Sequence, residues 1–182
     1  TVVRLVIRPP RAQYDARELG PLSFEVPGPP GAANDCVACV RADFAVANAQ
    51  NRALQCSLWR PQHDAEVTSA LAGARAAALV GSRTTLEGTP CVIYLHGNAS
   101  CRVEALAGCV SACAGLGVAV CALDCSGSGL SDGEYISLGL HEADDVTAVA
   151  DFLKDAYGVR TYGLWGRSMG AATALLYASE KA

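Results

Sequence analysis

The chain has 182 residues, of which 51% are hydrophobic and 18% charged, and its formal net charge is −4 at pH 7. This composition fits one globular domain and excludes a disordered chain, and the negative charge argues against nucleic acid as a partner. No apolar run reaches the roughly 18–20 residues of a membrane-spanning helix. We therefore expect no transmembrane segment, although peripheral contact with a membrane is compatible with these numbers.

Nine cysteines are many for this length, and their number is odd. Buried, reduced thiols in a cytoplasmic protein are the simplest interpretation, because free cysteine behaves as a small core residue. Cys36 and Cys39 form a lone CxxC without a second pair, so we predict no metal site and no cofactor. Four cysteines are expected on buried faces: Cys91, Cys109, Cys113 and Cys121.

The N-terminal part is proline-rich, and we interpret residues 1–36 as an arm on a domain formed by residues 37–182. The run "VVRLVI" at its start predicts one short strand. "DFAVAN" (43–48) and "ALQCSLW" (53–59) predict an antiparallel hairpin. Residues 61–90 are alanine-rich and read as an insertion, in which we expect His63 to be exposed to solvent.

From residue 91 onward, buried strands alternate with helices. The continuous apolar runs 91–97, 118–124 and 160–166 predict parallel strands covered on both faces. A parallel α/β sheet entered through an antiparallel hairpin is therefore the expected fold class. The first helix would follow Ser100, with apolar positions Val103, Leu106, Ala107, Val110 and Ala114. The second would bury Ala143, Val146, Val149, Leu153 and Tyr157, with Glu142, Asp144 and Asp145 suiting the positive end of its dipole.

The stretch "LWGRSMGAAT" places Ser168 between Gly166 and Gly170, after a strand and before a helix. This context is typical of a nucleophile elbow, in which glycines permit a turn so sharp that the serine hydroxyl is exposed. The N–H of Met169 would then face an oxyanion, aided by the helix N-terminus. The alternative is an ordinary serine that caps the helix.

A second oxyanion donor is expected where the first parallel strand ends, and the N–H of Asn98 is our candidate. His96 and Gly97 would support that loop, and we do not assign His96 as the general base, because the base follows the nucleophile in this architecture. His141 reads as a surface residue, and Asp124 and Asp132 as strand-end and loop residues. Arg167 would contact substrate or, as we favour, pair with a carboxylate.

Three motifs, "VIYLHGN", "ALDCSGSGLSDGEY" and "LWGRSMGAA", carry a family resemblance. In their order and spacing, residues 40–182 resemble the N-terminal half of an α/β-hydrolase of the S33-type serine aminopeptidase group. The resemblance implies a serine hydrolase that cleaves an ester, thioester or amide of a small-molecule or acyl substrate through an acyl-enzyme on Ser168. It implies Asn98 and Met169 as oxyanion donors.

The triad acid and histidine of that group should follow the elbow, and no histidine follows Ser168 here. We therefore expect an α/β-hydrolase fold truncated after the elbow helix, inactive alone, with strand 160–166 as an open edge prone to self-association.

Two other interpretations have some support in the sequence. Gly127-x-Gly129 suggests a dinucleotide site, but the third glycine and an adjacent helix start are missing. A non-catalytic binding or scaffold protein of the same fold is the second. The sequence gives no indication of oligomeric state.

Overall fold

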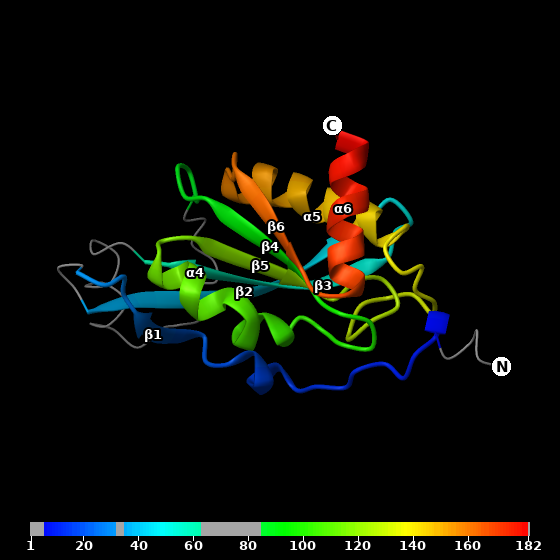
Figure 1. Ribbon diagram of the computed structural model, residues 1–182, viewed down its shortest axis with the longest axis horizontal. Helices are drawn as coiled ribbons and strands as arrows, with labels where there is room; N and C mark the ends of the chain where they lie inside the picture. Colours follow the sequence, from blue (N-terminus) through cyan, green and yellow to red (C-terminus); the bar gives the residue numbers. More distant parts are fainter. Residues whose placement is uncertain (1–5, 32–34, 63–84, 182) are drawn as a thin grey trace.

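The computed structural model describes residues 6–31, 35–62 and 85–181. Within them, a six-stranded mixed sheet has the strand order β1-β2-β3-β5-β4-β6 and carries helices on both faces (Figure 1). The predicted fold class is therefore confirmed. The strands are β1 (Ser23–Pro27), β2 (Cys36–Ala47), β3 (Ala53–Pro61), β4 (Cys91–Leu95), β5 (Ala119–Leu123) and β6 (Tyr162–Gly166).

The antiparallel half of the sheet contains the predicted hairpin and one strand that the sequence did not suggest. β2 and β3 pair antiparallel from Ala47↔Ala53 to Cys39↔Pro61. β1, inside the segment interpreted as an arm, pairs antiparallel with β2. The expected strand at "VVRLVI" is wrong where the structure describes it, because Val6 and Ile7 form a helical turn. The prolines that follow cannot donate to a strand ladder.

The parallel half brings three strand ends to one level. β4 lies between β5 and β6, and its last residue, Leu95, pairs with both Leu123 and Gly166. Because the three strands are parallel, the segments that leave their carboxyl ends meet at the same edge of the sheet. On its other side β6 pairs with no strand in the described part of the chain, and Tyr162 and Trp165 are exposed there.

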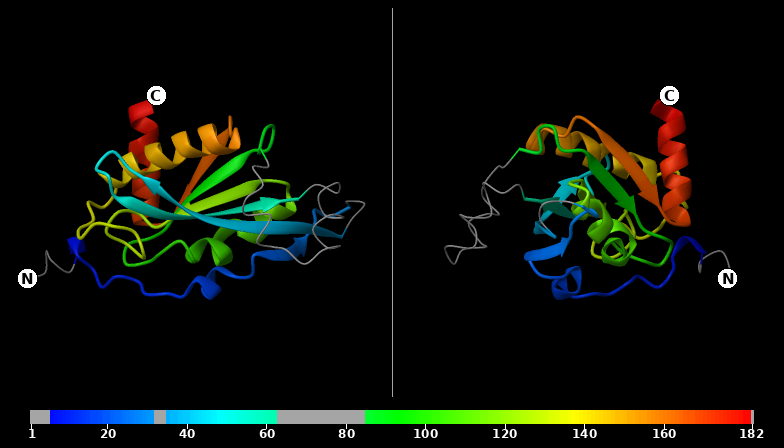
Figure 2. Two further views of the ribbon diagram at one scale, coloured as in Figure 1. Left: turned by 180° about the vertical axis from the view of Figure 1, so that it is seen from behind. Right: turned by 60° about the vertical axis from the view of Figure 1, so that its left-hand side comes forward.

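The helices cover the sheet unequally. α5 (Glu142–Tyr157) and α6 (Met169–Lys181) lie on one face. The other is covered by the N-terminal arm with its 3₁₀ turn η1 (Ala16–Leu19) and by the helical segment η2 (Leu106–Val110) and α4 (Ser111–Gly115), as Figure 2 shows.

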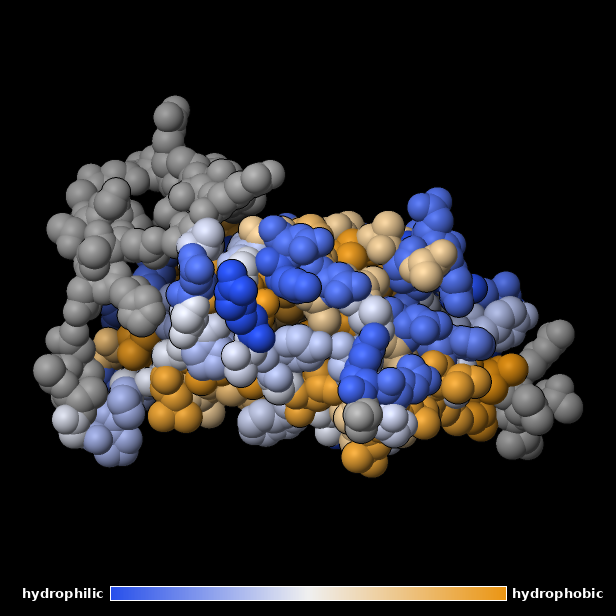
Figure 3. Space-filling model, turned by 90° about the horizontal axis from the view of Figure 1, so that it is seen from above, coloured by the Kyte–Doolittle hydropathy of each residue, from blue (hydrophilic) through white to orange (hydrophobic). Residues whose placement is uncertain are grey.

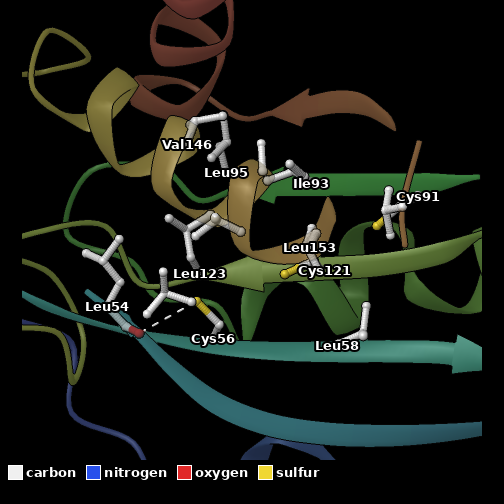
Figure 4. Close-up of a cluster of buried hydrophobic side chains, with 14 of the residues drawn as sticks. Leu54, Cys56, Leu58, Cys91, Ile93, Leu95, Cys121, Leu123, Val146 and Leu153 are labelled. Carbon is white, nitrogen blue, oxygen red and sulfur yellow. Dashed lines mark hydrogen bonds between the residues drawn. The ribbon is translucent and has the colours of Figure 1, made fainter. Parts of the chain in front are cut away.

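The main core lies between the sheet and α5 (Figure 4). Val146 and Leu153 from α5 point toward Leu95, Ile93 and Leu123 of the sheet. The predicted buried positions Ala143, Val146, Val149 and Leu153 are confirmed, whereas Tyr157 is only half-buried. Gly158 ends the helix in a left-handed conformation (φ 72°).

The first predicted helix is correct in place but wrong in detail. Helical residues begin at Glu104, not directly after Ser100, and Leu106–Val110 form a π turn. The wider turn changes which side chains face the sheet, so Ala107 is exposed whereas Ala105 and Cys109 are buried.

All nine cysteines are free, and every one except Cys36 is buried. The four that the sequence placed on buried faces are among them. Burial raises the pKa of the Cys91 and Cys109 thiols to about 12, which keeps both protonated near neutral pH.

Candidate active site

The turn between β6 and α6, at the carboxyl edge of the sheet, has a sterically constrained backbone. Ser168 is exposed and has φ 51°, a left-handed conformation that residues other than glycine seldom adopt. An N-cap serine has an extended backbone instead, so the reading of Ser168 as an ordinary cap does not fit. Met169 is the first residue of α6, and its N–H has no intrahelical partner.

Both flanking glycines are required by close packing. A β-carbon on Gly166 would lie 2.2 Å from the Gly170 carbonyl oxygen. A β-carbon on Gly170 would lie 2.0 Å from the Leu95 carbonyl oxygen. Real β-carbons do not approach so closely, so this turn accepts no side chain at either position.

Residues 96–100, which we call the β4 loop, run beside the turn. The Arg167 N–H donates to the Leu95 carbonyl at 3.1 Å. The guanidinium of Arg167 covers Gly97, with Nη2 3.3 Å from where a β-carbon of Gly97 would lie. Arg167 and Gly97, the chain neighbours of Ser168 and Asn98, therefore lie against each other.

His96 is fully buried and ties the β4 loop to the residues after β5. The Cys125 N–H donates to Nε2 at 3.1 Å, so this nitrogen is the acceptor. Nδ1 then carries the proton and donates to the Gly97 carbonyl at 2.7 Å. With both ring nitrogens engaged, His96 has no nitrogen free to take a proton from Ser168.

The β4 loop itself contains a strained residue. Ala99 has φ 59°, and the adjacent Asn98 is half-buried, with Nδ2 3.5 Å from the Val6 carbonyl oxygen. A left-handed alanine costs about 1 kcal/mol or more, and the conformation persists only where neighbouring contacts offset that cost. The loop conformation thus depends on what surrounds it.

Glu104 joins the β4 loop to the turn. Its carboxylate forms an ion pair with Arg167 and also accepts from the Tyr94 hydroxyl at 3.0 Å and the Gly97 N–H at 3.3 Å. Burial alone would raise the pKa of Glu104, but these hydrogen bonds outweigh it and lower the pKa. The carboxylate partner favoured for Arg167 is confirmed. The sequence did not identify which carboxylate pairs with Arg167. A signal was present, because Glu104 is the only acidic residue from 91 to 123.

Asp124, at the end of β5, is buried beneath the following loop. It accepts from the Arg102 N–H at 2.7 Å and from the Tyr14 hydroxyl at 2.6 Å. A β-carbon on Gly129 would lie 2.4 Å from its carboxyl group. The glycines at 127 and 129 thus belong to a tight loop, and α5 starts only at Glu142, so the dinucleotide fingerprint lacks its structural context.

The three acidic residues lie in the first turn of α5, as the sequence predicted, and two of them also accept hydrogen bonds from neighbouring loops. Glu142 and Asp145 are buried: Glu142 accepts from the Gly139 N–H at 2.7 Å, and Asp145 from the Ser126 N–H at 2.7 Å. Burial raises the pKa of Asp145. His141 is exposed as predicted, and His63 lies outside the described residues.

In the described ranges, no three His, Cys, Asp or Glu side chains gather as metal ligands would. None of the described helices combines the length and apolarity that a bilayer crossing requires.

Comparison with known proteins places this geometry in context. A family model described as serine aminopeptidase, S33, matches residues 88–182. Esterase Pf2001 of Pyrococcus furiosus superposes with a TM-score of 0.59 and 22% identity, over 96% of this chain and 53% of that one. XC6422 of Xanthomonas campestris, an α/β serine hydrolase without a lid, gives 0.57 and 20%, over 77% and 56%. No curated protein matches the sequence.

A third similar structure is Est1E of Butyrivibrio proteoclasticus with bound ferulic acid, with a TM-score of 0.53 and 20% identity, over 75% of this chain and 47% of that one. Identities this low show a shared fold and no more. The chain spans about half the length of these proteins.

Proposed function

The chain belongs to the S33 serine aminopeptidase family and has the α/β-hydrolase fold, and from this premise we propose that it carries the nucleophile of a serine hydrolase. The observation that supports the proposal most is the left-handed, exposed Ser168 at a strand–turn–helix junction closed by two glycines that no other residue could replace. This is the arrangement of a nucleophile elbow.

In the proposed reaction, the Ser168 hydroxyl attacks the carbonyl carbon of an ester, thioester or amide, and its proton passes to a general base. The Met169 and Asn98 N–H groups hold the oxyanion. The C–O, C–S or C–N bond breaks, the leaving group departs with the proton, and water then hydrolyses the acyl-enzyme and restores the serine.

The general base and its acid are proposed to come from segments outside this sequence. His96 is engaged through both ring nitrogens, and His141 directly precedes α5, on the chain before the nucleophile. In this fold the order is serine, acid, histidine, and the chain covers 53% of the Pyrococcus esterase. The 182-residue chain alone is therefore expected to be inactive.

An apolar acyl group is the substrate feature that the surface favours. Leu138, Leu140 and Leu176 are 41%, 58% and 38% exposed. Gly139, between the first two, packs against α6, since a β-carbon there would lie 3.1 Å from the Thr173 nitrogen. The face shown in Figure 3 carries hydrophobic side chains among hydrophilic ones, some of them along its lower right edge. Thr173 lies about 7–8 Å along the helix axis from Ser168, within reach of a medium-length acyl chain.

A fluorophosphonate probe on the full-length protein tests the proposal. Wild type should be labelled, Ser168→Ala should not, and Ser179→Ala, which changes an exposed serine of α6, should be labelled normally. No labelling of folded wild type would reject the hydrolase and favour the non-catalytic binding or scaffold protein.

A further inference from the structure

The N-terminal arm crosses the loops at the carboxyl edge of the sheet. We call residues 6–14 the strap. In Figure 1 it runs from near the loop after β5, on the right, along the underside of the molecule toward η1. Its contacts are with the two segments that flank the proposed site, the β4 loop and the loop after β5.

One end of the strap is anchored on Asp124. Tyr14 donates its hydroxyl hydrogen to Asp124 Oδ2 at 2.6 Å. Burial, and then the carboxylate, raise the pKa of Tyr14, so the hydroxyl stays protonated and remains a donor. Asp124 is fully buried and also binds Arg102, through its N–H at 2.7 Å and its Nη1 at 3.2 Å. Arg102 lies two residues after the end of the β4 loop. The Asp124 carboxylate therefore connects Tyr14 to the chain that leaves this loop.

The middle of the strap is held by the loop after β5. Arg11 donates from Nη1 to the Ser131 carbonyl at 2.7 Å and from Nη2 to the Gly133 carbonyl. Arg8 forms an ion pair with Glu134 at 2.7 Å. These contacts hold the strap against a loop far away in the sequence, since Arg11 and Ser131 are 120 positions apart.

The other end of the strap reaches the proposed oxyanion donor. The Ile7 carbonyl accepts from the Ile136 N–H at 2.8 Å, and the Val6 carbonyl lies 3.5 Å from Asn98 Nδ2. The strap therefore meets the β4 loop twice, at Asn98 and through Arg102.

We propose that the strap positions the oxyanion donor, with Tyr14 as a positioning residue that acts on Asn98 through Asp124 and Arg102. The inference rests on the proposed function. A catalytic donor must be held to within about 0.5 Å, and the β4 loop contains the left-handed Ala99, which needs outside contacts to persist. The strap supplies contacts on both sides of that residue.

Tyr14→Phe in the full-length protein tests the strap, because it removes the hydroxyl and keeps the ring that packs over the Arg102 guanidinium. We expect kcat to fall about 10-fold with KM unchanged, and a transition-state analogue to bind weaker by the same factor. Amide hydrogen exchange of residues 96–102 should be faster. Arg11→Gln, which breaks a different anchor, should act in the same direction.

Arg17→Gln is the matched control, because Arg17 lies in the same arm but pairs with Asp15 at the surface. It should leave kinetics and exchange unchanged. Wild-type kcat and exchange in both Tyr14→Phe and Arg11→Gln would overturn the proposal. A wild type unreactive toward fluorophosphonate would reject the proposed function instead, and exchange at 96–102 would then decide alone whether the strap restrains the loop.

Discussion

The carbonyl oxygen of Leu95 occupies the space that a side chain on Gly170 would need, 2.0 Å from the ideal β-carbon position. Leu95 ends β4 and Gly170 lies in the first turn of α6, so this contact sets how closely the helix approaches the central strand. The proximity of the turn at Ser168 to the β4 loop follows from it.

Gly170→Ala should therefore destabilise the protein by about 3 kcal/mol or more, because neither backbone can move without disrupting the sheet. The free energy of unfolding in urea measures this. Gly163→Ala, in β6 where a β-carbon meets nothing within 4 Å, should change it by no more than about 0.5 kcal/mol. Equal stabilities of the two variants would contradict the packing described.

Leu138→Asn should reduce the preference for long acyl chains without unfolding the loop. Leu138 has φ 57°, and asparagine tolerates that conformation well. The ratio of kcat/KM for p-nitrophenyl octanoate to that for the acetate should fall about 10-fold in the full-length protein. Leu116→Asn makes the same change at a more exposed leucine, 70% against 41%, beyond α4 on the opposite face, and should keep the ratio. An unaltered ratio in Leu138→Asn would remove Leu138 from the acyl site.

Glu104→Gln should lower stability by about 1 kcal/mol at pH 7, because the carboxylate loses its ion pair and part of its hydrogen bonding. The pKa of Glu104 is lowered in the folded state, so its contribution is present above the unfolded pKa of about 4.3 and is lost as pH falls through the folded value. The difference in the free energy of unfolding between Glu104→Gln and wild type should therefore become smaller below about pH 4. Chemical denaturation at several pH values gives the result, with the exposed Glu25→Gln as control; a constant difference would argue against the assigned cause.

Brief alkylation of the native chain at neutral pH should modify Cys36 alone, since the other eight thiols are buried. Peptide mapping by mass spectrometry identifies the site, and unfolding in denaturant should make all nine reactive. Cys36→Ser should abolish the rapid reaction. Fast labelling of Cys109 or Cys121 in folded protein would show that the core is open.

The parts of the fold that the sequence predicted are those set by local pattern. The apolar runs of β4, β5 and β6 and the 3.6-residue spacing of α5 are visible within each segment. β1 was missed because "SFEVP" becomes a strand only by pairing with β2. The π turn was missed because no local pattern marks it; within it, Gly108 lies against the Tyr94 ring, and a β-carbon there would be 3.1 Å from the ring.

The same division applies to the candidate site. Gly166, Ser168 and Gly170 could be read from spacing, since the turn is built from consecutive residues. The partners that surround it could not: Tyr14 meets Asp124 across 110 residues and Arg167 meets Glu104 across 63. Contacts of that kind depend on the assembled fold, so no local motif announces them.

The shared register of β4 has one further consequence. Leu95 is paired with β5 on one side and with β6 on the other, so the position of β4 sets the register of both neighbouring strands. Deleting one residue from β4 would exchange the side chains on its two faces. It would also shift the β4 loop, which carries His96, relative to both the residues after β5 and the turn after β6. Length changes should therefore be tolerated least at the middle of the sheet, far less than in the connections that lead into it.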